Sequence, residues 1–413
     1  FAPYLVPLVA YKFTGKTLAL TTKLTRVMFS AVMMTAIAGL ESGILNSYQE
    51  FTASAFGPIV YNIGIIAGAL MLGKKIGVYG LSVGVLIGAA GNVLTQYFST
   101  VKHATGRFRF NLDIHNKGFK QIIGLVIPAL IGLSITQINL IVNQNIASGL
   151  SAGSITALRY ANRLYQLPLG IFAMAISTAF FPTMTRQVSV ADYKGFKSTF
   201  SQGLGSILFI TVPSSVGLIV LSQPIVRLLF KSGSFTEANV RLTAFTLIFY
   251  SLGLFAYSAI QVITRGFYAI KDTRTPVIIG AIAVGINIIL NLAFVRFSNL
   301  ALGGIAFSYS LAGIINMIML LYILSKKVGE IGLGGVIKTF GKSAVASAIM
   351  GVCVYFFYSG LTSVLGEVSK MSQLISTGGS IIVGVAVFVL MSYILKIDEL
   401  DVIMDMIKRR IKK

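Results

Sequence analysis

Two arginines and a glutamine recur at helical spacing where a long apolar segment begins. Arg159, Arg163 and Gln166 stand at positions i, i+4 and i+7 at the start of the segment from Leu158 to Phe181, which places them on one face of a helix. A charge inside a membrane-length helix is costly, so these side chains should face water or a bound partner rather than lipid. Arginine stays protonated and its planar fork suits phosphate oxygens. The pattern therefore indicates an anion-binding face, on which Arg163 is the deeper arginine.

The composition assigns the chain to the integral membrane proteins. Its 413 residues include 11% charged residues and no tryptophan, and the mean hydropathy is +0.84. A soluble domain carries about 25% charged residues, and a membrane helix needs about 20 apolar residues. The net charge of +22 lies between apolar segments rather than on a soluble basic face, so we do not expect nucleic acid as a partner. The predicted fold class is all-α, a polytopic membrane protein.

The residues that enzymes use are sparse. The single cysteine, Cys353, lies in an apolar run and rules out an internal disulfide framework and most metal–cysteine sites. His103 and His115 share one loop without metal-binding spacing, and no GxxxxGK[ST] loop is present, which argues against ATP hydrolysis by this chain. The sequence predicts a transporter rather than an enzyme.

Eleven apolar segments are predicted to span the membrane. Most lysines and arginines lie in alternate loops and in the tail from Asp398 to Lys413, which the positive-inside rule places in the cytoplasm. The basic end of the tail is expected to lie along anionic headgroups. The segments cover residues of about 24–46, 54–74, 77–100, 119–148, 155–183, 199–222, 239–268, 275–297, 302–325, 338–360 and 374–396.

A weak internal repeat relates the first three segments to three later ones. Gly80 and Asn92 recur as Gly304 and Asn316 at a constant offset of 224. Internal repeats are common in transporters, where substrates bind near the interface between the copies. Three further segments precede the later copy and none precedes the first. We therefore expect about three more helices before Phe1, which would give fourteen in all.

Two motifs resemble the MurJ/MviN family of bacterial lipid II flippases. They are Tyr160–Gly170 (YANRLYQLPLG) and Arg265–Pro276 (RGFYAIKDTRTP), and the resemblance extends over essentially the whole chain. It implies the two-lobe fold of the multidrug/oligosaccharidyl-lipid/polysaccharide exporter superfamily, of whose helices this chain would hold the fourth to the fourteenth. The implied layout is the rest of the N-lobe (1–101), a cytoplasmic loop (102–118), the C-lobe (119–327), a helix pair lining a groove for the lipid tail (328–397) and a basic cytoplasmic tail (398–413).

The resemblance implies flipping of lipid II from the cytoplasmic to the outer leaflet. We expect the membrane potential to drive this outward movement of an anion, with one lobe rocking against the other to give alternating access. Arg163 would bind the pyrophosphate in a central cationic cavity, with Arg159 in support and Asn162 and Gln166 as polar liners. Arg159 could instead snorkel to an interface. Asn162 stands where relatives often carry aspartate. Glu41 would pair with a cavity arginine or line the portal; alternatively, it reaches water at the cytoplasmic end.

Some family members hold sodium between their seventh, eleventh and twelfth helices. The matching positions are Asn143, Asn287 and Asn291, which lack the acidic ligands of such a site. Amides alone bind a hard cation weakly. The alternative is that the three side chains form interhelical hydrogen bonds. No cofactor is otherwise expected.

The expected partners are lipid II or a similar polyprenyl-pyrophosphate glycolipid and the lipids of the bacterial inner membrane, with the protein a monomer. A flippase for another polyprenyl-linked oligosaccharide, of the O-antigen or capsule type, is the nearest alternative. An ion-coupled drug exporter would need carboxylates for cationic drugs, whereas the identified cavity charge is positive. A membrane scaffold without transport would leave Arg163 unexplained.

Overall fold

The computed structural model describes residues 1–103, 115–151, 153–297, 300–366 and 369–400, and within these ranges the regular structure is entirely helical. The chain forms two compact units, Phe1–Pro128 and Ala129–Lys413. The predicted cytoplasmic loop and basic tail lie largely in 104–114 and 401–413, outside the described residues.

The described helices confirm an all-α polytopic membrane protein. Nine are long and apolar enough to cross a membrane, and the pair α11 (Glu237–Ser251) and α12 (Leu254–Ala269), bent by 44°, makes a tenth candidate. Helix α6 (Lys117–Ser148) has 32 residues, or about 48 Å at 1.5 Å per residue, which is also enough to span. Together these helices coincide with the eleven predicted segments. They are longer than the apolar segments because their polar ends continue the helical turns.

The unit Phe1–Pro128 is held together by close contact between helix backbones. A Cβ atom added at Gly64 would lie 2.4 Å from the Cα of Gly88, and one added at Gly68 would lie 2.4 Å from the Cα of Gly84. Small residues at such positions allow membrane helices to pack without large side chains between them. The helices involved are α1 (Ala2–Val9), α2 (Gly15–Ser47), α3 (Thr52–Ala67), the π-helical turn η1 (Gly68–Leu72), α4 (Gly73–Ile76) and α5 (Val78–His103).

The unit Ala129–Lys413 packs its helices around apolar cores. One core gathers Phe196, Phe200 and Phe267, and another gathers Tyr165, Leu247 and other side chains of α7, α11 and α14. The helices are α7 (Ser154–Pro168), the π-helical turn η2 (Leu169–Ala173), α8 (Met174–Ser189), α9 (Tyr193–Val220), α10 (Ser222–Phe230), α11, α12, α13 (Arg274–Phe297) and α14 (Leu302–Val328).

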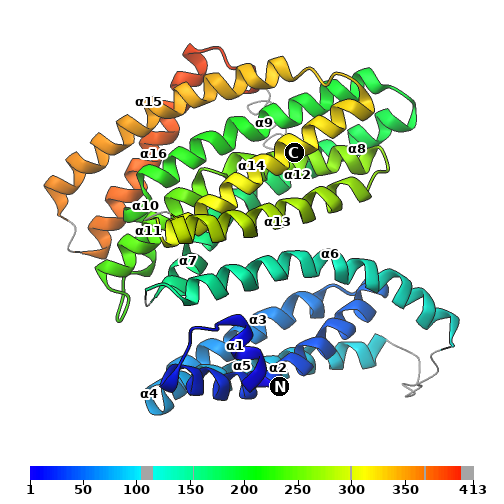
Figure 1. Ribbon diagram of the computed structural model, residues 1–413, viewed down its shortest axis with the longest axis vertical. Coiled ribbons are helices and arrows are strands. Elements are labelled where there is room, and N and C mark those ends of the chain that lie inside the picture. Colours follow the sequence, from blue (N-terminus) through cyan, green and yellow to red (C-terminus); the bar gives the residue numbers. More distant parts are fainter. Residues whose placement is uncertain (104–114, 152, 298–299, 367–368, 401–413) are drawn as a thin grey trace. The chain divides into compact units, whose positions relative to one another are not determined.

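The last two helices form an antiparallel pair beside α9. Helices α15 (Leu333–Leu365) and α16 (Lys370–Ile394) run next to each other, orange and red in Figure 1, and α15 also packs along α9. Phe209 of α9, Met350 of α15 and Phe388 of α16 meet in a third apolar core. These helices match the last two predicted segments.

The second sequence motif has a structural task at the junction between α12 and α13. Asp272 Oδ1 accepts the N–H groups of Arg274 at 3.1 Å and Thr275 at 3.0 Å, which caps the N-terminus of α13. Lys327 at the end of α14 forms an ion pair with the same carboxylate. Burial opposes ionisation, but hydrogen bonds from Lys327 and Thr275 outweigh it and lower the pKa of Asp272 to about 2. The motif thus fixes two neighbouring helices at one end.

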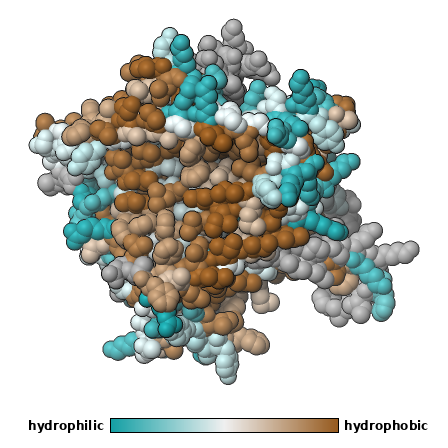
Figure 2. Space-filling view, turned by 45° about the horizontal axis from the view of Figure 1, so that its top comes forward, coloured by the Kyte–Doolittle hydropathy of each residue, from teal (hydrophilic) through white to brown (hydrophobic). Residues whose placement is uncertain are grey.

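The surface of the molecule is that of a protein surrounded by lipid. On the face drawn in Figure 2, apolar side chains cover the middle of the surface and hydrophilic ones gather toward its edges. Many large apolar side chains are exposed, among them Ile382 of α16 and Phe356 of α15. Such a surface suits the hydrocarbon core of a bilayer.

Candidate functional site

Helix α7 has one face in the core and an opposite face that is open within its unit. Ala157, Ala161 and Leu164 are buried in the core. Arg159 and Arg163 are exposed, as is Gln166. The structure therefore brings the predicted polar residues onto one exposed face of a helix, as their spacing indicated.

The two arginines of this face differ in their contacts. Arg159 donates through Nη2 to Oε1 of Gln144 on α6 at 3.2 Å, and Gln166 donates to Oδ1 of the half-buried Asn162. Within the described residues Arg163 makes neither a hydrogen bond nor an ion pair. Its guanidinium therefore keeps all its donors for a ligand or for water.

Four tyrosines, two buried and two half-buried, fix the orientation of α7 on its core side. Tyr165 contacts Tyr250, Tyr257 and Tyr309, with ring centroids 5.7, 6.2 and 6.0 Å away. Tyr257 and Tyr309 are stacked at 4.4 Å. Aromatic contacts of this kind add about 0.5–1.5 kcal/mol each beyond area burial. Because Tyr165 is fixed among these rings, Arg163, two residues earlier, points to the other side. The sequence analysis did not find this cluster, since its members are spread over four helices.

The three predicted sodium-site residues lie together, and a fourth asparagine joins them. Asn139 donates to Asn287 at 2.8 Å and Asn143 donates to Asn139 at 3.0 Å. Asn291 donates to Asn143 at 2.6 Å and to Asn287 at 3.2 Å. All four are buried. The result is a closed ring of amide hydrogen bonds between α6 and α13. Asn139 was missed, although paired N-x-x-x-N spacings in two apolar segments were a visible signal.

The donor set of this ring does not fit a resident sodium ion. Three of the four amide oxygens already accept N–H groups, and only Oδ1 of Asn291 has no partner among the described residues. No carboxylate belongs to the ring, and hard cations prefer several oxygen ligands including charged ones.

Glu41 lies inside its own unit rather than on an open face. The side chain on α2 is 8% exposed, and its Oε2 has no hydrogen-bond partner among the described residues. The buried positions Ala38 and Leu45 flank it along the same helix. This placement does not bring Glu41 to the surface of the unit Phe1–Pro128.

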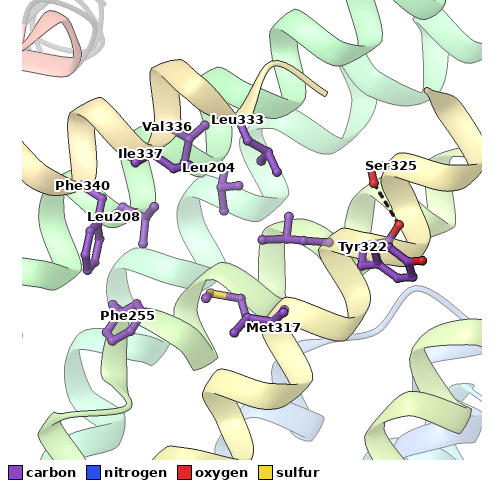
Figure 3. Close-up of a pocket in the computed structure, with 12 residues that line it drawn as sticks. Leu204, Leu208, Phe255, Met317, Tyr322, Ser325, Leu333, Val336, Ile337 and Phe340 are labelled. Atoms are coloured by element: carbon purple, nitrogen blue, oxygen red, sulfur yellow. Dashed lines mark hydrogen bonds between the residues drawn. The ribbon is translucent and has the colours of Figure 1, made fainter. Parts of the chain in front are cut away.

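Two apolar cavities lie along α9. One, of about 490 Å³, is bounded by Phe209 of α9, Met350 of α15 and Phe388 of α16. The other, of about 430 Å³, lies between α9, α12, α14 and α15, and Figure 3 shows Leu208, Phe255, Met317 and Phe340 turned toward it. Both are lined almost wholly by carbon, so they suit hydrocarbon chains.

The comparisons with known proteins agree with this architecture. The family model described as "Lipid II flippase MurJ" matches residues 1–375. The chain belongs to the MurJ family. The family is one of lipid II flippases, which are transporters and not enzymes, as the sequence motifs predicted.

Individual MurJ relatives show the same likeness. The chain is 32% identical over 401 residues to the probable lipid II flippase MurJ of Rhizobium tropici, an alignment that covers 95% of this chain and 74% of the relative. It is 33% identical over 334 residues to that of Vibrio cholerae, covering 78% of this chain and 63% of the relative. A solved structure of lipid II flippase MurJ in an inward closed conformation superposes with a TM-score of 0.78 at 31% identity, over 96% of this chain and 78% of that one.

Proposed function

We propose that the full protein moves lipid II from the cytoplasmic to the outer leaflet of the bacterial inner membrane. Membership of the MurJ family supports this. The observation that carries it is Arg163, an exposed arginine without a partner among the described residues, on a helix that is long and apolar enough to span a membrane.

The anion-binding task follows from the chemistry of the substrate. Lipid II presents a pyrophosphate, so an unaided crossing would bury roughly two negative charges, at a high cost in hydrocarbon. Arg163 would bind phosphate oxygens with both arms of its guanidinium. Arg159, already positioned by Gln144, would add a second charge, and Asn162 and Gln166 would offer neutral polar groups to the sugar or to water.

The hydrocarbon tail needs a separate surface. The cavity of about 490 Å³ beside α9, α15 and α16 has the apolar lining that a polyprenyl chain requires. We propose that it takes part of the tail while the headgroup stays at α7. Both features belong to the unit Ala129–Lys413, which would act as the C-lobe with the added helix pair.

We propose that the membrane potential, rather than a bound cofactor, drives the cycle. Moving an anion outward from a negative interior is favourable by about 2.3 kcal/mol per charge per 100 mV. One lobe would rock against the other to expose the site alternately to each side. The asparagine ring would act as an interhelical clasp that needs no sodium. The protein would work as a monomer. Its C-terminus would lie in the cytoplasm, as the loop charges indicate.

Complementation tests the proposed function and the role of Arg163 together. In cells depleted of their own lipid II flippase, the full-length gene is supplied as wild type, Arg163→Lys, Arg163→Ala or Arg296→Ala at matched membrane levels. Arg296→Ala is the control, because Arg296 is an exposed arginine outside the α7 face. We expect rescue by wild type and control, no rescue by Arg163→Ala, and a transport rate about 10- to 100-fold lower for Arg163→Lys, since a charged hydrogen bond contributes about 1.5–3 kcal/mol.

Two results would contradict the proposal in different ways. Rescue by Arg163→Ala at the wild-type level would remove the anion-binding role of Arg163. Failure of wild type to rescue, with the protein present in the membrane, would point to another polyprenyl-linked oligosaccharide as substrate.

A further inference from the structure

We infer that Glu41 is a proton-binding site in the interior of the unit Phe1–Pro128, with Gln96 as the partner of the protonated carboxyl group. Glu41 on α2 is 8% exposed and Gln96 on α5 is 3% exposed. Oε2 of Glu41 and Oε1 of Gln96 are both buried without a hydrogen-bond partner among the described residues. Two buried acceptor atoms without partners in one helix interface of a membrane protein require a hydrogen-bond donor.

The two side chains lie at the same depth on neighbouring helices. Helices α2 and α5 pack against each other, and Glu50 just beyond α2 approaches His103 at the end of α5, with 4.0 Å between Oε2 and Nε2. Glu41 stands six residues before the end of α2 at Ser47, and Gln96 seven before the end of α5. At a rise of 1.5 Å per residue, both lie about 10 Å from the shared end.

Helix α3 packs against the interface between α2 and α5 at the level of Gln96. A Cβ atom added at Gly57 would lie 2.8 Å from Nε2 of Gln96, so α3 touches Gln96 directly. Ser54 lies one turn from Gly57, and Thr100 lies one turn from Gln96. The hydroxyl oxygens of both are also buried without a partner among the described residues. Four unbonded polar atoms therefore belong to one end of a three-helix interface.

The hydroxyl groups of Ser54 and Thr100 could each donate one hydrogen bond, but they carry no charge that would balance an ionised Glu41. A bound proton removes the negative charge itself. Nε2 of Gln96 already donates to Oδ1 of Asn92 at 2.7 Å, so the amide oxygen is the atom of Gln96 without a partner among the described residues. This oxygen and an ionised Glu41 carboxylate are both acceptors only, so neither can satisfy the other. A proton bound to the Glu41 carboxylate makes a neutral acid whose O–H can donate to Oε1 of Gln96. No bond is broken and no other reactant is needed. The neutral acid also avoids an unpaired buried charge, which is among the costliest states in a membrane protein.

The charged groups around this interface leave the carboxylate without a counter-ion. From α5 they are Lys102 and His103, and from the α2–α3 link Glu50, all near the helix end. The cations of α2 itself, Lys16, Lys23 and Arg26, lie 15 or more residues before Glu41, which is about 22 Å or more along the helix. Helix α3 brings only the phenol of Tyr61, and α1 brings the exposed Tyr4 and the amino group of Phe1. Glu41 forms no ion pair among the described residues.

Infrared spectroscopy of the full-length protein in lipid at neutral pH tests the site without reference to the substrate. We expect a carbonyl band of a protonated carboxylic acid in the wild type and its loss in Glu41→Gln. Glu50→Gln, which changes the half-buried acid at the same helix end, should keep the band. Glu399→Gln is a second control, because Oε2 of Glu399 is also unbonded while its Oε1 accepts from Thr339 at 2.7 Å.

Each infrared result either supports or overturns the assignment of a proton to Glu41. A wild-type spectrum without the band, or one that Glu41→Gln leaves unchanged, overturns the proposal. A band that is absent in sodium and appears only after sodium is removed would assign a cation rather than a proton to the same oxygens, and also overturns it. If Glu41→Gln does not accumulate, Glu41→Asp in protein with ¹³C-labelled glutamate carboxyl groups replaces it: a band that comes from position 41 then loses its isotope shift, and a band that keeps the shift overturns the proposal. Failure to flip lipid II would leave all these results unaffected.

Discussion

The contact between α3 and α5 is sensitive to a single methyl group. In Gly88→Ala the new Cβ would lie 2.4 Å from the carbonyl oxygen of Tyr61, which is backbone and cannot rotate away. Ordinary contact begins at 3.4 Å, so the helices must part by about 1 Å. Overpacking of this kind costs about 1–3 kcal/mol, and the better helix propensity of alanine returns about 1 kcal/mol. The clash is with backbone, so the upper end of the overpacking range applies, and we expect a net loss of about 2 kcal/mol, which shifts the unfolding equilibrium about 30-fold.

The matched control is Gly43→Ala on α2. A Cβ atom added there meets nothing within 4 Å, so the substitution should be neutral or slightly stabilising through helix propensity. Thermal unfolding of the full-length protein in detergent would compare both variants with wild type, with a lower Tm expected for Gly88→Ala only. Equal Tm values for the two variants would refute the close approach of the α3 and α5 backbones.

Two other features give predictions of their own. Asn291→Asp removes the amide that donates to Asn143 and Asn287, so we expect the free energy of unfolding to fall by about 0.5–2 kcal/mol. We also expect sodium to stabilise the variant but not the wild type. Tm measured in sodium and in choline salts checks both results. Asp272→Asn removes the ion pair with Lys327. Because the folded pKa of Asp272 is lowered to about 2, below its unfolded value of about 3.9, its contribution to stability is complete above about pH 4 and is lost as the pH falls toward 2. The Asn variant should therefore be less stable near neutral pH and should show a weaker pH dependence of Tm in this acid range, whereas an unchanged profile would contradict a stabilising ion pair between Asp272 and Lys327.

The helices could be predicted because hydropathy alone determines which segments enter a bilayer. Every predicted apolar segment coincides with a helix or a bent helix pair. The helix ends could not be predicted in the same way. Helix α2, for example, begins at Gly15, well before the apolar segment, because backbone hydrogen bonds favour continued turns in the polar headgroup region too.

The asparagine ring depends on a contact between two helices that the pattern of a single segment does not predict. Asn139 and Asn143 are four residues apart, as are Asn287 and Asn291, and both cross-helix pairs are separated by 148 positions. The equal separation means that α6 and α13 meet in a single register. Periodicity within a segment indicates which residues share a face, but it gives neither the partner helix nor the register, which depend on packing.

The contrast between Arg163 and Glu41 shows why one site residue could be oriented from the sequence and the other could not. Helix α7 carries a polar face opposite its apolar one, so its rotation follows from the pattern and the arginine must face outward. Most of α2 is apolar on all sides around Glu41, so either rotation satisfies the lipid equally well. The fold makes the choice by burying Ala38, Glu41 and Leu45 within the unit, where α2 packs mainly along α5. A carboxyl group turned inward in this way has no cation beside it among the described residues, and a buried charge without a counter-ion is costly. The rotation of α2 is therefore the basis on which we propose Glu41 as a proton site.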